Sequence, residues 1–126
     1  SWGAVDAVGE ILASRPEFCS PFLPPLIQLS LIPSFLEGVL RALGRIAEEK
    51  ADLLHGLSSR MLPFLTHPLP GVRGAAALLL GNLKAGAARE ALETLLKDGA
   101  VIDIYRNGAM EKKAVAQLAM ESLSKI

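Results

Sequence analysis

A pattern of about ten residues recurs four times along the chain, and this repetition limits the possible folds more than any other feature. Three copies carry glycine at one fixed position and the fourth carries serine: these register residues are Gly9, Gly44, Gly81 and Ser124. They are 35, 37 and 43 positions apart. A unit of this length buries its apolar face only by stacking on copies of itself. With 126 residues, the chain is expected to form a single domain, 1–126.

Each copy has the apolar spacing of an amphipathic helix. In the second copy, apolar side chains share one face: Leu36, Val39, Leu40, Leu43 and Ile46. The copies therefore predict inner-layer helices over 2–11, 37–46, 74–83 and 117–126. Glycine inside a helix costs about 1 kcal/mol relative to alanine. Its recurrence indicates that a neighbouring helix approaches closely at that position.

Apolar segments of helix length separate these copies, at 21–30, 53–66 and 87–96, and proline or glycine turns bound them. Paired helices at this period predict an all-α fold, an α-solenoid of about 3.5 helical-hairpin repeats. The repeats span roughly 1–14 (partial), 16–49, 51–86 and 87–126. Because proline disrupts a helix interior, we expect the outer helix with Pro24 and Pro25 to be short or kinked.

One segment, near 100–112, has the pattern of a β-hairpin instead. The run 101–105 is β-branched and aromatic, and Asn107-Gly108 favours a two-residue turn. With that tip, Tyr105 faces Met110 and Asp103 faces Lys112. The inserted hairpin accounts for the longest spacing. It is expected either to cover the C-terminal end of the stack or to dock a partner.

The segment 65–81, with His67-Pro68, Val72-Arg73 and Ala75-Ala76 at characteristic spacing, resembles HEAT repeats of the bacterial PBS-lyase HEAT-like type. The resemblance implies an armadillo/HEAT-like superhelix. Members of this family often carry an acidic residue after His-Pro that pairs with an arginine of a neighbouring repeat. Leu69 stands at that place, so Arg73 is expected to lack an evident partner.

Composition narrows the functional classes. Thirteen basic and thirteen acidic residues cancel, which argues against nucleic acid as a partner. No apolar run reaches membrane-spanning length. The single cysteine, Cys19, is expected in the core and suits a cytoplasmic location. Neither His55 nor His67 has neighbours at metal-ligand spacing, and the sequence predicts no catalytic site, metal or cofactor.

The sequence thus favours a non-enzymatic protein-interaction scaffold whose partner binds the concave inner helices and the hairpin. The candidate partner-binding residues are Arg41, Arg45, Arg73, Asn82, Tyr105 and Arg106. Repeat alignment also predicts exposed ion pairs, Asp6 with Arg41 and Glu10 with Arg45, each worth about 0 to 1 kcal/mol. Two alternatives stay open: a bilin (chromophore) lyase or its accessory factor, as the repeat type implies, and a nucleic-acid-binding HEAT-like module.

The first inner helix lacks an outer helix before it. Its apolar residues Val5, Val8 and Leu12 therefore suggest that the chain is the C-terminal portion of a longer solenoid. Alternatively, this uncapped N-terminal face supports self-association or packing on another chain.

Overall fold

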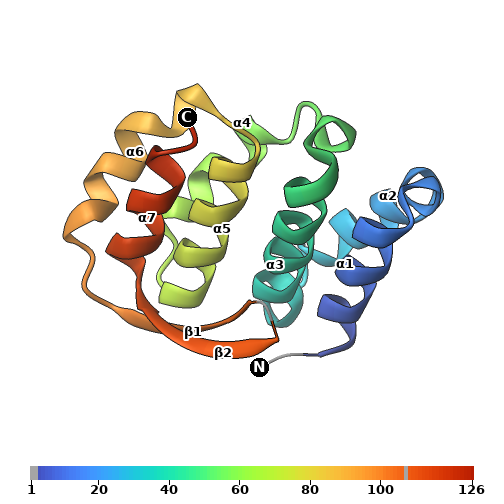
Figure 1. Ribbon diagram of the computed structural model, residues 1–126, viewed down its shortest axis with the longest axis horizontal. Coiled ribbons are helices and arrows are strands. Elements are labelled where there is room, and N and C mark those ends of the chain that lie inside the picture. Colours follow the sequence, from blue (N-terminus) through green and yellow to red (C-terminus); the bar gives the residue numbers. More distant parts are fainter. Residues whose placement is uncertain (1–2, 107) are drawn as a thin grey trace.

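The computed structural model describes residues 3–106 and 108–126 and shows a two-layer stack of helices with one β-hairpin (Figure 1). The inner layer consists of α1 (Ala4–Ser14), α3 (Pro33–Lys50), α5 (Pro70–Asn82) and α7 (Val115–Leu123). The outer layer contains α2 (Cys19–Leu29), α4 (Ser58–Met61) and α6 (Arg89–Thr94), lengthened by 3₁₀ turns. The expectation of an all-α solenoid with an inserted hairpin is confirmed.

Burial of the apolar stripes holds the layers together. Each inner helix packs on the next, α1 on α3, α3 on α5 and α5 on α7. The stripe of α3 is fully enclosed, with Val39, Leu40, Leu43 and Ile46 all at 0% exposure. Cys19 also lies in this core, and burial raises the pKa of its thiol. None of the helices in the described part of the chain is long and apolar enough to cross a membrane.

Two of the register glycines let inner helices approach closely. A Cβ atom on Gly9 would lie 2.7 Å from the Cα atom of Ala42, and one on Gly81 would lie 2.7 Å from the Cα atom of Ser122. Gly44 differs, because a Cβ atom there would make an ordinary contact of 3.9 Å with Leu79. The close-packing role expected from the repetition is therefore confirmed at Gly9 and Gly81, and it is wrong at Gly44.

The outer layer departs from the sequence expectation in two places. Helix α2 runs for 11 residues through Pro24 and Pro25, so the expected shortening is wrong. Both prolines are exposed, which leaves water to solvate the carbonyl groups that they deprive of a donor. The expected single helix over 53–66 is also wrong. Gly56 at φ +86° interrupts it, and the segment forms short helical turns before and after that position.

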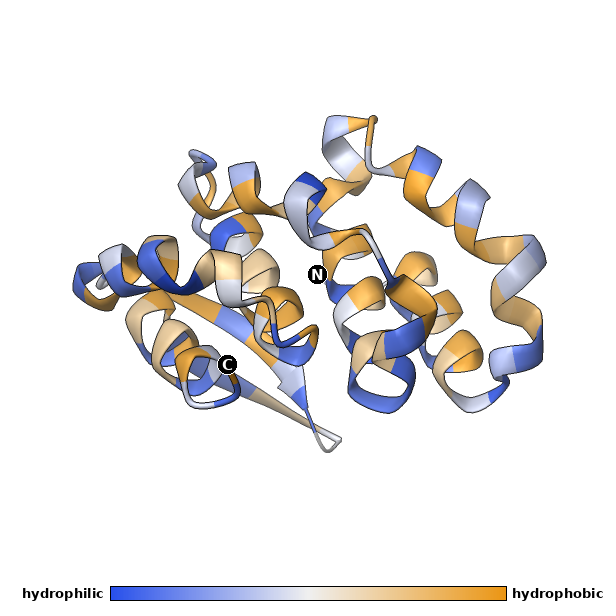
Figure 2. Cartoon of the chain, turned by 90° about the horizontal axis from the view of Figure 1, so that it is seen from above, coloured by the Kyte–Doolittle hydropathy of each residue, from blue (hydrophilic) through white to orange (hydrophobic). Residues whose placement is uncertain are grey.

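The hairpin pairs β1 (Val101–Arg106) with β2 (Ala109–Ala114) in the predicted register. Tyr105 faces Met110, and Lys112 Nζ lies 2.8 Å from Asp103 Oδ1. Asn107, expected at the tip, lies outside the described residues. The ribbon extends from α7 towards α3 along one end of the inner helices, and seen from above it passes beneath them (Figures 1 and 2). It packs on α5 and α7, so it crosses the inner layer and does not cover the last repeat alone.

Candidate functional site

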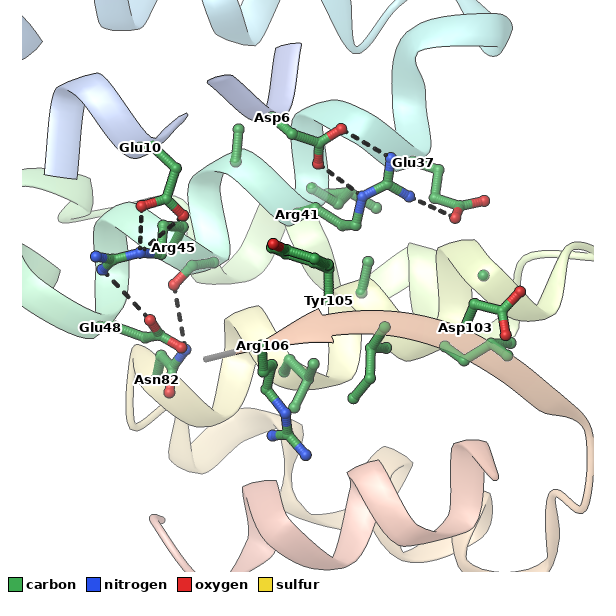
Figure 3. A pocket seen from close by; sticks show the side chains of 18 of the residues that line it. Asp6, Glu10, Glu37, Arg41, Arg45, Glu48, Asn82, Asp103, Tyr105 and Arg106 are labelled. Atoms are coloured by element: carbon green, nitrogen blue, oxygen red, sulfur yellow. Dashed lines mark hydrogen bonds and ion pairs between the residues drawn. The ribbon is translucent and has the colours of Figure 1, made fainter. Parts of the chain in front are cut away.

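The inner helices and strand β1 together line a cavity of about 100 Å³, which we call the inner cavity (Figure 3). Apolar side chains from α3, α5 and β1 form much of its wall, among them Leu40, Leu78 and Ile102. Five of the six residues predicted to bind a partner line it: Arg41, Arg45, Asn82, Tyr105 and Arg106. Residues far apart in sequence are thereby brought to one place.

Arg41 is held by two carboxylates on different repeats. Its Nε lies 2.8 Å from Asp6 Oδ1 and its Nη2 lies 3.1 Å from Asp6 Oδ2, a two-point contact between α3 and α1. Its Nη1 donates to Glu37 Oε2 at 2.6 Å. The hydrogen bond with Asp6 is the main reason that the pKa of Arg41 is raised. The predicted pair exists, but the expectation that it is exposed is wrong, because the Asp6 side chain is only 3% exposed.

Arg45, one helical turn later, pairs with carboxylates in the same way but at a more solvent-exposed position. Its Nε donates to the carboxylate of Glu10 at 3.0 Å, and its Nη1 lies 3.4 Å from Glu48 Oε2 (Figure 3). The same Nη1 lies 3.2 Å from Glu49 Oε1. The Glu10 side chain is 45% exposed, so this second predicted pair is exposed as expected. Partial burial acts to lower the pKa of Arg45, but the combined effect of the Glu10, Glu49 and Glu48 carboxylates is larger and raises that pKa.

The contacts between equivalent positions of successive repeats continue on the later repeats, where the residues are neutral or basic. Asn82 Nδ2 donates to the carbonyl oxygen of Gly44 at 3.2 Å. Lys125 Nζ donates to Asn82 Oδ1 at 2.7 Å. Asn82 therefore joins α3 to the chain segment after α7, and it occupies the register position of Glu10 and Arg45.

Arg106, at the end of β1, is directed towards α7 and away from Tyr105 (Figure 3). Its Nη1 donates to Glu121 Oε1 at 2.7 Å, and its Nε lies 3.6 Å from Glu111 Oε2. The contact with Arg106 is the main cause that lowers the pKa of Glu121. Arg106 therefore fixes the hairpin on the last repeat. Tyr105, 42% exposed, faces the inner cavity.

Arg73 lies apart from the inner cavity, and the expectation that it lacks a partner is wrong. Its Nε donates to Asp98 Oδ2 at 2.7 Å, and its Nη1 donates to the carbonyl oxygens of His67 and Pro68. The hydrogen bond from the Arg73 side chain is the main cause that lowers the pKa of Asp98. Asp98 replaces the acidic residue absent at Leu69, but it lies 25 residues after Arg73 in the chain.

Several residues of the inner cavity are absent from the predicted set. Repeat alignment places Asp6 and Glu10 opposite Arg41 and Arg45, so the sequence contains a signal for these two residues. For Leu78 the signal was its place in the same register as Asp6 and Arg41. Ile102 gave no such signal, because its position depends on where the hairpin folds.

The inner cavity offers shape and charge more than reactive groups. Five carboxylates bond to Arg41 and Arg45, namely Asp6, Glu10, Glu37, Glu48 and Glu49. All of these except Glu49 line the inner cavity, whose described lining holds five acidic residues, Asp103 included, against four basic ones. No group of three or more His, Cys, Asp or Glu residues that could hold a metal ion occurs in the part of the chain that the structure describes.

Stacked helical pairs with a shared core and register contacts between successive repeats define the class of α-solenoid repeat proteins. Within that class, residues 33–83 match the family model of the HEAT-like repeat. This stretch spans α3, the short outer turns and α5. HEAT-like repeats generally mediate protein interactions.

One curated relative shares part of the sequence. It is the methylmalonyl-CoA carboxyltransferase 12S subunit of Propionibacterium freudenreichii subsp. shermanii, 36% identical over 70 residues. The match covers 56% of this chain and 13% of that subunit. No solved structure gives a significant match to the chain.

Proposed function

We propose that the chain is a non-enzymatic interaction module that binds a partner protein in the inner cavity. The observation that carries this proposal is the cavity itself, where α3, α5 and β1 contribute an apolar wall and all the repeats contribute charged or polar side chains around it. Such a mixture is typical of protein interfaces, which combine an apolar centre with a polar rim. The HEAT-like repeat within residues 33–83 supports the same role.

The local charge favours a protein partner over a nucleic acid. A phosphate backbone needs uncompensated lysine and arginine, whereas Arg41 and Arg45 are outnumbered by the carboxylates around them. The carboxyltransferase activity of the named relative is not carried over to this chain, because the match covers 13% of that subunit. A bilin-lyase role has no support beyond the resemblance of the repeats.

The proposal is tested with a pair of leucine-to-glutamate variants. Leu78→Glu places a charge in the apolar wall of the inner cavity, and Leu53→Glu, the control, places the same charge on the outer layer, where Leu53 is 40% exposed. A partner recovered from native lysate is purified and titrated against each protein by calorimetry. We expect Leu78→Glu to weaken binding at least about tenfold, because a buried unpaired charge is costly.

Circular dichroism and thermal unfolding of both variants verify that they are folded. Equal affinity of the partner for the wild-type chain and the Leu78→Glu variant would exclude the inner cavity as the binding site. A loss confined to Leu53→Glu would place the interface on the outer layer instead.

A further inference from the structure

The edge of strand β1 that faces away from β2 lies at the inner cavity. Five consecutive residues of β1, from Ile102 to Arg106, line this cavity. The sheet contains two strands in the described part of the chain, so β1 has a neighbour on one side alone. An edge strand exposes a row of backbone donors and acceptors that can pair with another extended chain.

The register decides which backbone groups point to that edge. Ala100 accepts a hydrogen bond from Val115 N–H at 2.8 Å, and Arg106 faces Ala109 across the two-residue turn. Even-numbered residues of β1 therefore exchange hydrogen bonds with β2, and odd-numbered residues direct their N–H and C=O groups away from it. Val101 and Asp103 thus present backbone donors and acceptors along the free edge of β1.

The two outer edges of the hairpin are not equally accessible to another strand. β2 carries Glu111, Lys112 and Lys113 in succession, and consecutive charges of this kind discourage strand addition. β1 carries two charged residues, Asp103 and Arg106, and they are not adjacent. Its edge is bordered by a second cavity of about 230 Å³, whose lining includes Glu37, Gly71 and Asp103.

Charge near this edge indicates what kind of chain fits. Glu37 and Glu48 on α3 and Glu10 on α1 are 39%, 46% and 45% exposed, so their carboxylates can accept further hydrogen bonds. With Asp103 and the buried Asp6, they give the lining of the inner cavity five carboxylates against four basic groups. Lysine or arginine side chains are the natural complement.

We propose that the partner adds an extended, lysine- or arginine-containing segment as a third strand along the free edge of β1, at the mouth of the inner cavity, paired to the backbone of Val101 and Asp103. This inference rests on the proposed function and adds the conformation and charge of the bound segment. Backbone pairing supplies affinity in such β-augmentation, and alternate side chains supply specificity. Here one set of side chains contacts the apolar wall at Leu78 and the other meets the carboxylates.

The test uses a matched pair of proline variants and a defined probe. The probe is an acetylated, amidated hexapeptide of alternating lysine and valine. Asp103→Pro removes an N–H group from the free edge of β1, and Lys112→Pro removes one from the outer edge of β2. Asp103 and Lys112 are cross-strand partners, so both variants lose the same ion pair and keep all hydrogen bonds between the strands. Asp103→Asn controls for the charge.

We expect nuclear magnetic resonance titration to show the peptide bound to the wild-type chain and to the Lys112→Pro variant with similar affinity. Asp103→Pro should weaken binding roughly tenfold, through a lost hydrogen bond and the bulk of the proline ring, and Asp103→Asn should weaken it less. In the wild-type chain the peptide should slow amide hydrogen exchange at Val101 and Asp103. An otherwise identical peptide with glutamate in place of lysine should bind more weakly.

Three results would overturn strand addition: no binding of the lysine-valine peptide, equal binding to both proline variants, or unchanged exchange at Val101 and Asp103. A partner that binds as a helix would leave the Asp103→Pro variant fully active in partner binding. In that case Leu78→Glu would still abolish capture of the native partner, and the proposed function would stand without the third strand.

Discussion

At the scale of single residues, backbone proximity decides what a glycine does. Gly9, Gly44 and Gly81 share one register, and the nearest residue of the next inner helix always lies two positions before its own register residue: Ala42, Leu79 and Ser122. At Gly9 an added methyl group would meet the Cα and Cβ atoms of Ala42, and at Gly81 it would meet the Oγ, Cβ and Cα atoms of Ser122. At Gly44 the space is sufficient for one.

Alanine substitution at these positions should therefore give opposite results. Gly81→Ala should destabilise the chain by about 1 to 3 kcal/mol, because overpacking forces α5 and α7 apart. Gly44→Ala should stabilise it by up to about 1 kcal/mol through helix propensity. Urea unfolding followed by circular dichroism measures both. A stabilised Gly81→Ala protein would contradict the close approach of the two helices.

At the scale of elements, one aspartate joins the hairpin to the inner layer. Asp98 accepts hydrogen bonds from Arg73 on α5 and from the backbone N–H of Ala100 just before β1. Its backbone carbonyl accepts from the N–H of Ala116 in the first turn of α7. The Asp98 and Arg73 side chains are 16% and 17% exposed. This partly buried pair therefore sets where the hairpin leaves and rejoins the helices.

Asp98→Asn should lower the free energy of unfolding by about 1 to 3 kcal/mol at pH 7, because Arg73 loses its counter-charge. It should also reduce acid sensitivity. The folded-state pKa of Asp98 is below its ordinary value of 3.8, so its stabilisation is complete above that value and is lost as pH falls through the lowered pKa. Unfolding curves between neutral and acidic pH measure the difference. A variant with undiminished acid sensitivity would contradict this assignment.

At the scale of the whole molecule, the two ends of the stack differ. The first helical pair has an apolar groove of about 410 Å³, lined by α1 and α2 residues that include Val5, Val8 and Phe22. Ile11 on α1 and Phe22 on α2 are 55% and 53% exposed. Ala7, two positions before the first register glycine, is exposed as well. The exposed face of α1 thus resembles the face of α3 that packs against α1, with apolar side chains and an alanine two positions before the register glycine.

We propose that this face supports self-association, as the sequence suggests, because apolar patches of this kind mark contact sites. Sedimentation velocity of the wild-type chain should show association that increases with concentration. Ile11→Glu should abolish it, whereas Met120→Glu, at an equally exposed apolar position on α7 (64% exposed), should not. A monomeric wild-type chain, or an Ile11→Glu variant that still associates, would exclude this face as the contact.

Local signals predicted much of this architecture. Helical spacing over 37–46 and 74–83 identified α3 and α5, and Asn107-Gly108 identified the hairpin and its register. Propensity failed where surroundings override it. Pro24 and Pro25 lie within α2 because their side of the helix faces solvent, and Gly56 breaks the apolar run 53–66.

Repeat spacing by itself determined the stacking order and two contacts between repeats, Asp6 with Arg41 and Glu10 with Arg45, because equal spacing brings equivalent positions together. Only the tertiary structure decided that Asp6 is buried while Glu10 is exposed to solvent, that Asp98 pairs with Arg73, and that the hairpin crosses the inner layer. The periodicity of a sequence indicates which residues are neighbours within one repeat and between successive repeats. Burial, and the path of a segment that is not repeated, depend on everything that surrounds them in space.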